Sequence, residues 1–153
     1  MQKEMNFSLP EISVITAVYN GIDSLEPSIN SVLNQTYNNI EFIIIDGGST
    51  DGTVDIIKKY EDRIAFWVSE KDKGVYDAMN KGVERATGEW IYFLGSGDIL
   101  LNVMDRISKL LIDSNKVYYG DVFRLDTQEK YDGEFSAYKL AITNICHQAI
   151  FYR

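Results

Sequence analysis

The sequence has little of several residues that define common protein classes. Its 153 residues contain one cysteine, one histidine and two prolines. A single cysteine excludes an intrachain disulfide and a zinc site built from cysteines. No apolar run is long enough to span a bilayer, and the first residues lack the apolar core of a signal peptide. These absences predict a cytoplasmic protein, with at most a peripheral association at the inner face of the cell membrane.

Basic residues are also scarce. The chain has 15 Lys and Arg against 23 Asp and Glu, a net charge of −8, and it has no basic run. A nucleic-acid partner is therefore not expected. A nucleoside diphosphate is compatible with an acidic protein, because a bound divalent cation supplies the positive charge. Hydrophobic residues make up 45% of the chain, which is enough for the core of one globular domain.

Two common nucleotide-binding motifs are missing. Gly47, Gly48 and Gly52 do not have the Gly-x-Gly-x-x-Gly spacing, so a Rossmann dehydrogenase is not supported. No Gly-x-x-x-x-Gly-Lys-Ser/Thr sequence is present, which excludes a P-loop NTPase. The one histidine, His147, gives no basis for a Ser-His-Asp triad.

The hydrophobic pattern alternates between strands and helices. Short apolar runs at 12–18, 41–45, 64–68 and 90–94 are typical of buried strands, and helical spacing of apolar residues lies between them. Another helix is expected after residue 103, and short strands at 117–119, 121–125 and 148–152. This order predicts an α/β fold with a mostly parallel central sheet flanked by helices.

Polar residues follow three of the predicted strands, namely Tyr19-Asn20, residues 46–51 and residues 95–98. In parallel sheets, ligands bind at the carboxyl ends of the strands. The convergence of these clusters on one edge is the main indication of a site in the residues themselves.

Each candidate residue also has a structural interpretation. The Asp98 carboxylate could hold a divalent cation together with phosphates and water, or it could cap a following helix. Asp46, Ser49 and Asp51 could recognise phosphate or start a helix. A lone histidine such as His147 is more often a hydrogen-bonded structural residue than a ligand.

Five segments, in order and with matching spacing, resemble the family 2 glycosyltransferases. They are residues 14–20 (Val-Ile-Thr-Ala-Val-Tyr-Asn), 31–37, 46–53 (Asp-Gly-Gly-Ser-Thr-Asp-Gly-Thr), 72–82 (Asp-Lys-Gly-Val-Tyr-Asp-Ala-Met-Asn-Lys-Gly) and 86–94. The combination of Asp-Gly-Gly-Ser and Ser-Gly-Asp is similar to bacterial enzymes of the colanic-acid type and others that build surface polysaccharides.

The resemblance implies a GT-A fold, a Rossmann-like nucleotide-diphospho-sugar transferase fold. It implies metal-assisted transfer, with inversion, from a UDP- or GDP-sugar to a saccharide or lipid-linked saccharide acceptor. The implied metal is Mg²⁺ or Mn²⁺, held by Asp98. The residues implied to bind the nucleotide sugar are Ala17, Tyr19, Asp46, Gly48, Ser49, Lys73, Asp77, Ser96, Gly97 and His147.

The resemblance also implies a domain organisation. Residues 1–153 form a single GT-A domain, in which 10–101 bind the nucleotide sugar and 102–153 begin a truncated acceptor-side half. The catalytic base is then expected beyond Arg153. Two departures from the family pattern leave alternatives open: Asp46-Gly47 replaces two adjacent acids, and only Asp98 remains of an Asp-x-Asp motif. A non-catalytic nucleotide-sugar-binding domain of the same fold is one alternative, and a sugar nucleotidyltransferase is another.

Overall fold

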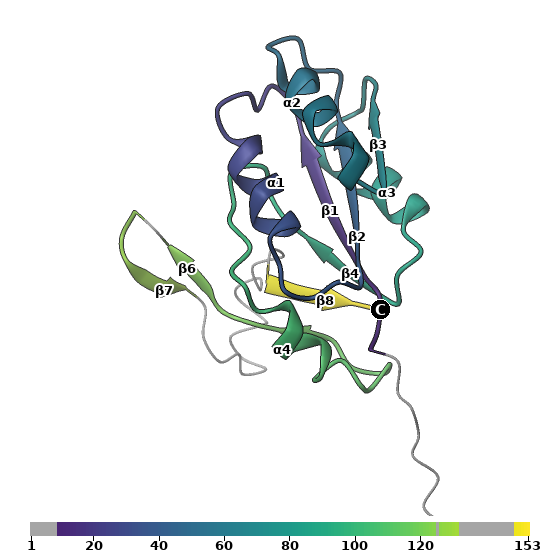
Figure 1. Ribbon diagram of the computed structural model, residues 1–153, viewed down its shortest axis with the longest axis vertical. Helices are drawn as coiled ribbons and strands as arrows, with labels where there is room; N and C mark the ends of the chain where they lie inside the picture. The colour runs from purple at the N-terminus through teal and green to yellow at the C-terminus, as the bar shows by residue number, and fades with distance from the viewer. Residues whose placement is uncertain (1–8, 125, 132–148) are drawn as a thin grey trace, which may run out of the picture.

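The computed structural model describes residues 9–124, 126–131 and 149–153. Its elements follow one another as the hydrophobic pattern predicts, and Figure 1 shows their arrangement. The strands are β1 (Ile12–Val18), β2 (Ile40–Asp46), β3 (Phe66–Ser69), β4 (Trp90–Phe93), β5 (Tyr118–Tyr119), β6 (Val122–Arg124), β7 (Glu129–Tyr131) and β8 (Ile150–Tyr152). The helices are α1 (Leu25–Leu33), α2 (Thr53–Lys59), the 3₁₀ turn η1 (Glu61–Arg63), α3 (Val75–Arg85) and α4 (Met104–Ser108).

Six strands form one sheet in the order β3-β2-β1-β4-β8-β5. The four strands from β1 to β4 are parallel, and β8 runs antiparallel to both of its neighbours. The predicted mostly parallel sheet is therefore confirmed. Strands β6 and β7 form a separate hairpin that stands beside the main sheet (Figure 1). The register places Val18, Asp46 and Ser69 at one level, so the three loops that follow begin at the same edge.

Helices cover both faces of the sheet, as the β-branched, apolar strands require. On one face, alternate residues of β1 and β2 pack with α1, α2 and α4 around Trp90, which is fully buried. On the other face, Ile15, Ile43 and Ile45 pack against Ala78 of α3. Within the described ranges, no helix is both long and apolar enough to cross a bilayer.

Gly82 sets how closely α3 approaches β1. A Cβ atom on Gly82 would lie 2.4 Å from Cγ2 of Ile15, which is buried and β-branched. For Gly82→Ala we expect the clash, about 1–3 kcal/mol, to outweigh the helix-propensity gain of about 1 kcal/mol. Urea denaturation should show a lower free energy of unfolding. Gly120→Ala is the control, because a Cβ there meets nothing within 4 Å. Equal stability of the two variants would contradict this account of the packing.

Glu41 ties the amino ends of β1 and β2 to the turn after α3. Its Oε2 accepts from the Ser13 hydroxyl at 2.5 Å and from the Thr87 backbone N–H at 2.8 Å, and its Oε1 accepts from the Thr87 hydroxyl at 2.8 Å. Partial burial alone would raise the pKa of Glu41. The hydrogen bonds outweigh it and bring the pKa below its ordinary value of 4.5.

This lowered pKa gives a pH-dependent prediction. A carboxyl group with a depressed folded pKa stabilises the protein above its unfolded pKa, and the contribution is lost as the pH falls through the folded pKa. Glu41→Gln should therefore cost about 1 kcal/mol near neutral pH, and the difference from the unaltered protein should shrink under acid conditions. Denaturation across pH 3 to 7 measures this, with the exposed Glu84→Gln as control. A constant difference at all pH values would show that ionisation of Glu41 is irrelevant.

The structure corrects the sequence-based boundaries in several places. The expected helix after residue 103 is short and ends at Ser108. Ile22, expected on the apolar face of the first helix, lies before α1 and is 44% exposed. Strand β7 was not expected from the pattern. Strand β8 pairs with β4, so residues from 10–101 and from 102–153 share the main sheet, and the predicted division of the one domain into these halves stays a prediction.

Candidate functional site

The loops after β1 and β2 are joined at the carboxyl edge of the sheet. Asn20, with a positive φ of 50°, holds the first loop in a tight turn. Hydrogen bonds run from Asn20 N to Ser49 Oγ (2.7 Å), Gly21 N to Thr53 Oγ1 (2.8 Å), Ile22 N to Asp51 Oδ2 (3.0 Å) and Thr50 N to Asn20 Oδ1 (3.0 Å). The two polar clusters that the sequence placed at neighbouring strand ends therefore form one preorganised surface.

Asp51 fixes the start of α2. Its Oδ1 accepts from the Thr53 hydroxyl at 2.5 Å and from the Thr53 backbone N–H at 3.0 Å. The hydroxyl bond is the main reason why the pKa of Asp51 lies below its ordinary value. Of the three helix-capping candidates, Asp51 is the one that bonds to the first residue of the helix.

Asp46 is turned inwards. It is fully buried, and its Oδ2 accepts from Gly48 N at 3.1 Å, Ser49 N at 3.0 Å and Ser69 Oγ at 2.6 Å. The Ser49 hydroxyl donates to Oδ1. The carboxylate thus organises the loop from below. A contact of this carboxylate with the base stays a prediction.

A cavity of about 210 Å³ lies at the carboxyl end of β1. We call it the Tyr19 cavity; it is lined by Ala17, Val18, Tyr19, Asp72, Gly74, Val75 and Ala78. Tyr19 is 66% exposed, so its aromatic ring is accessible from solvent. Asp72 packs closely against Gly47, because a Cβ atom on Gly47 would lie 2.6 Å from Asp72 Oδ2.

Lys73 and Asp77 lie beside this cavity at the start of α3. The backbone N–H of Lys73 donates to Asp77 Oδ2 at 3.0 Å, and the Lys73 side chain is exposed. The Asp77 carboxylate therefore orders the entry into the helix. A direct contact of either side chain with a ligand stays a prediction.

The turn after β4 is held by the start of α1. Gly97 has φ 103°, a conformation that favours glycine, and its N–H donates to Ser28 Oγ at 2.9 Å. Ser96 Oγ lies 3.2 Å from Ser24 Oγ. This turn also contacts the first loop, because a Cβ on Gly21 would lie 2.9 Å from Ser96 Oγ. All three polar clusters therefore meet at one edge of the sheet.

Asp98 projects from this turn and is exposed. Its carboxylate makes no hydrogen bond or ion pair with the described part of the chain, whereas its N–H donates to Gly95 O at 3.0 Å. The next helix starts at Met104, so Asp98 does not cap it. An unpaired exposed carboxylate beside a glycine is consistent with a partial ligand set for a hard cation.

A metal would need further ligands from elsewhere. Among residues 9–124, 126–131 and 149–153, no group of three His, Cys, Asp or Glu side chains is placed to hold an ion. Mg²⁺ and Mn²⁺ are commonly held by one or two carboxylates, with substrate phosphates and water completing the shell. The residues present thus fit such an ion only together with a phosphate ligand.

The structure brings most of the predicted site residues to one edge. Ala17 and Tyr19 line a cavity, Gly48 and Ser49 form the adjoining loop, and Ser96, Gly97 and Asp98 form the third side. His147 lies outside the described residues. Sequence reasoning did not select Asp72, although it lies in the quoted segment 72–82, because its approach to Gly47 is visible only in the structure.

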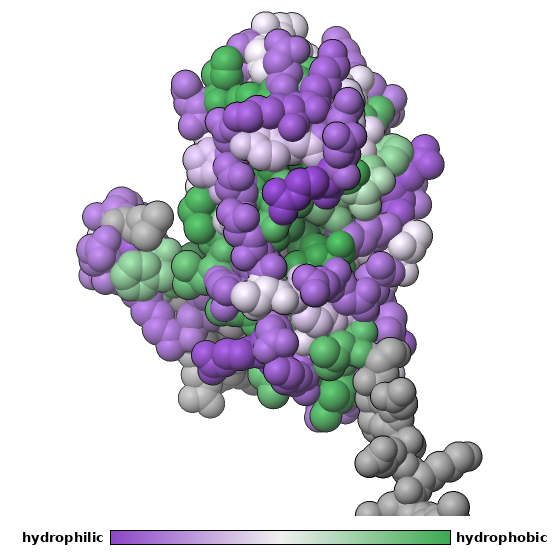
Figure 2. Space-filling model, in the orientation of Figure 1, coloured by the Kyte–Doolittle hydropathy of each residue, from purple (hydrophilic) through white to green (hydrophobic). Residues whose placement is uncertain are grey.

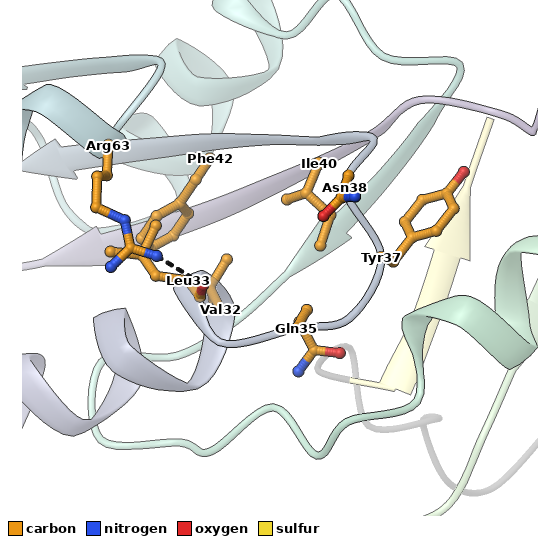
Figure 3. A pocket seen from close by; sticks show the side chains of 8 residues that line it. All are labelled: Val32, Leu33, Gln35, Tyr37, Asn38, Ile40, Phe42 and Arg63. Atoms are coloured by element: carbon orange, nitrogen blue, oxygen red, sulfur yellow. Dashed lines mark hydrogen bonds between the residues drawn. The ribbon is translucent and has the colours of Figure 1, made fainter.

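A further hollow, of about 310 Å³, lies away from this edge, between the end of α1 and the start of β2 (Figure 3). Its lining includes Tyr37, Phe42 and Arg63, and the Arg63 guanidinium donates to the carbonyl of Leu33 at 2.8 Å. Arg63 therefore provides a hydrogen-bond donor for a backbone carbonyl at the carboxyl end of α1. The hollow has no acidic side chain in its lining and is separate from the candidate site.

The sheet order, with polar loops at its carboxyl edge, defines an α/β domain of the kind in which ligands bind beyond the strand ends. The chain belongs to glycosyl transferase family 2, whose sequence pattern matches residues 13–136. It is 37% identical over 152 residues to a PGL/p-HBAD biosynthesis glycosyltransferase of Mycobacterium bovis, covering 94% of this chain and 59% of that protein. An uncharacterized glycosyltransferase of Haemophilus influenzae is 41% identical over 107 residues, covering 68% of this chain and 42% of that one.

Solved structures share the fold. TarS of S. aureus, residues 1–349 in complex with UDP-GlcNAc, aligns with TM-score 0.60 and 25% identity over 67% of this chain and 31% of TarS. A mannosyltransferase of Pyrobaculum calidifontis, in complex with GDP-Man and Mn²⁺, aligns with TM-score 0.64 and 21% identity, over 72% of this chain and 35% of that one. The predicted GT-A fold is confirmed. The chain spans about three fifths of the length of the mycobacterial relatives.

Proposed function

We propose that this chain is the donor-binding part of a glycosyltransferase that moves a sugar from a UDP- or GDP-sugar to a hydroxyl acceptor. One observation carries the proposal: the Tyr19 cavity and the exposed Asp98 carboxylate lie on the same edge, and the loop contacts of Gly21 with Ser96 connect them. A nucleoside would occupy the cavity, and its diphosphate would extend toward Asp98. The donors named for TarS and the mannosyltransferase support this arrangement.

The residues of the chain would divide the work between binding and orientation. Tyr19 and Asp72 would flank the nucleoside, and the loop that Asp46 orders would keep Gly48 and Ser49 in place. Asp98 would hold Mg²⁺ or Mn²⁺; such an ion, when bound, offsets the negative charge that develops on a diphosphate leaving group. The proposal includes inversion by direct displacement. The proton of the acceptor hydroxyl needs a base, and no described residue is assigned that role.

The setting of the reaction is part of the same proposal. Resemblance at 46–53 and 95–98 supports bacterial surface-polysaccharide synthesis, with a saccharide or lipid-linked saccharide acceptor at the cytoplasmic face of the membrane. This rests on association with a family and not on the chemistry of the site.

A non-catalytic nucleotide-sugar-binding domain is the second candidate. The inward orientation of Asp46 and the single carboxylate at the metal position favour it. A nucleotidyltransferase has less support, because the loop at 19–23 has no basic residue to hold a triphosphate.

Calorimetric titration with UDP, GDP and CMP, each with and without Mn²⁺, tests the proposal. Metal-dependent binding of UDP or GDP is the expected result, and it would identify the base. Binding of none of the three nucleotides would overturn the donor-site assignment for this chain. Sugar transfer is then measured with a protein that spans the full length of its relatives. Metal-dependent nucleotide binding without sugar transfer would favour the non-catalytic alternative.

A further inference from the structure

Another hollow adjoins Asp98, which does not line the Tyr19 cavity. We call it the Phe123 hollow. It measures about 390 Å³, and its lining is Gly97, Asp98, Ile99, Leu101, Phe123, Arg124 and Asp126. The first four residues belong to the turn after β4, and the others come from β6 and the residues after it. A ligand in this hollow would touch the same carboxylate that the proposed donor approaches from the other side.

The Phe123 hollow is mainly apolar. Three large side chains in its lining are well exposed: Ile99 at 43%, Leu101 at 62% and Phe123 at 49%. Figure 2 shows apolar atoms on the body of the molecule next to the β6–β7 hairpin. A smaller cavity of about 140 Å³ shares Asp98, Ile99 and Leu101 with the hollow, and extends it past the buried Leu94.

Besides Asp98, the charged side chains that line the Phe123 hollow are Arg124 and Asp126, which pair with each other. The Arg124 guanidinium donates to Asp126 Oδ2 at 3.0 Å. A ligand with many hydroxyl groups would lose hydrogen bonds to water on entering and would gain few in return, which is unfavourable. An apolar group would instead bury the exposed carbon atoms of Ile99, Leu101 and Phe123.

The wall that carries Ile99 and Leu101 is fixed by hydrogen bonds. Gln35 Nε2 donates to the carbonyls of Leu100 at 3.1 Å and Leu101 at 3.0 Å. Asn102 Oδ1 accepts from Thr36 Oγ1 at 3.0 Å. The backbone is thus anchored to the end of α1, while the Leu101 side chain is presented to solvent. An ordered apolar wall needs little reorganisation to bind a ligand.

We infer that the Phe123 hollow binds the acceptor through an apolar aglycone, an alkyl or aryl group attached close to the hydroxyl that receives the sugar. The inference rests on the proposed function, because Asp98 marks where the donor diphosphate would lie. The hydroxyl would face Asp98, and the apolar group would lie between Leu101 and Phe123. A free sugar lacks this group and would bind less tightly.

The test compares octyl β-D-glucoside, below its micelle concentration, with methyl β-D-glucoside. Binding is followed by NMR titration in the presence of UDP or GDP and Mg²⁺, which is diamagnetic and does not broaden the signals near Asp98. The octyl compound should bind at least about tenfold more tightly, as expected for burial of several methylene groups. Leu101→Ala and Phe123→Ala should each weaken octyl binding about fivefold to tenfold.

Leu110→Ala is the matched control, because Leu110 is also 62% exposed but lies outside the hollow. Equal binding of the two glucosides, or an equal effect of Leu110→Ala, would overturn the inference. So would a concentration-dependent dimer that Phe123→Ala dissociates, because the hollow would then be an interface between two copies.

Nucleotide titration of the same variants separates this inference from the proposed function. Unchanged nucleotide affinity together with weakened octyl binding supports the inference. Nucleotide binding without octyl selectivity overturns the inference alone. If the octyl compound is preferred but no nucleotide binds, the donor-site assignment is wrong. The hollow then has no role as an acceptor site either.

Discussion

Replacing Asp98 by alanine is expected to abolish the gain in nucleotide affinity that Mn²⁺ provides. The Asp98 carboxylate is exposed, unpaired within the described chain and adjacent to the turn at Gly97. It is also the one acid that this sequence has where the family resemblance implies an Asp-x-Asp motif. Since loss of outer-shell partners of a metal typically costs about 10–100-fold in affinity, loss of a direct ligand should cost at least as much.

Calorimetric titration with UDP or GDP, with and without Mn²⁺, measures this effect. Asp98→Asn is an informative companion, because the amide keeps the size of the side chain but removes its charge, and most of the metal effect should be lost. Asp62→Ala is the control: Asp62 is exposed in η1, which precedes β3 and lies outside the carboxyl edge. If the Asp98→Ala protein retained the full effect of Mn²⁺ on nucleotide affinity, the assignment of the cation to Asp98 would be wrong.

Replacing Asp46 by alanine should lower the free energy of unfolding more than Gly82→Ala or Glu41→Gln does. The change would remove the buried acceptor that the half-buried Gly48 and Ser49 N–H groups and the hydroxyl of the exposed Ser69 use. A buried donor without an acceptor costs about 1–3 kcal/mol, and because water can reach these partly exposed groups we expect a total of about 2–4 kcal/mol. The loop at 46–51 would also lose its fixed shape, so nucleotide affinity should fall.

Chemical denaturation gives the free energy of unfolding for this comparison. Asp46→Asn should cost less than Asp46→Ala, because the amide oxygen still accepts hydrogen bonds. The exposed Glu84→Ala serves as the control. If Asp46→Ala lowered nucleotide affinity and left stability unchanged, the carboxylate would act on the ligand directly, as its place in the strand-end motif first indicated.

The fold was largely predictable because burial on both faces constrains β1 to β4. The run at 12–18 matches β1 residue for residue, and the run at 41–45 lies inside β2. The periodicity of apolar residues predicted helix boundaries less reliably where few side chains are buried. Ile22 has helical spacing relative to α1, but its backbone N–H bonds to Asp51 and stays outside the helix. The pattern after residue 103 likewise continued beyond the end of α4.

The site was predictable as a region and less so in its side-chain orientations. Spacing and strand ends placed Tyr19, Asp46 and Asp98 at one edge, but they could not show that Asp46 points inwards. That orientation depends on Ser69, which the register of β3 brings opposite Asp46. Asp72 was overlooked because its position depends on the approach of one loop to Gly47. Contacts between distant segments leave no local trace in the sequence.

The place of β8 has a consequence for the order of assembly. β8 inserts between β4 and β5, although it follows both in the chain. As the polypeptide leaves the ribosome, β1 to β4 can pair as soon as they are made, but the outer edge of β4 must wait for β8. Until then, that edge has unpaired backbone N–H and C=O groups beside the aromatic side chain of Tyr92. Such an edge can pair with the wrong strand or with another chain and cause misfolding or aggregation. A pause in synthesis between β5 and β8 would therefore be the interval in which this protein most needs a chaperone.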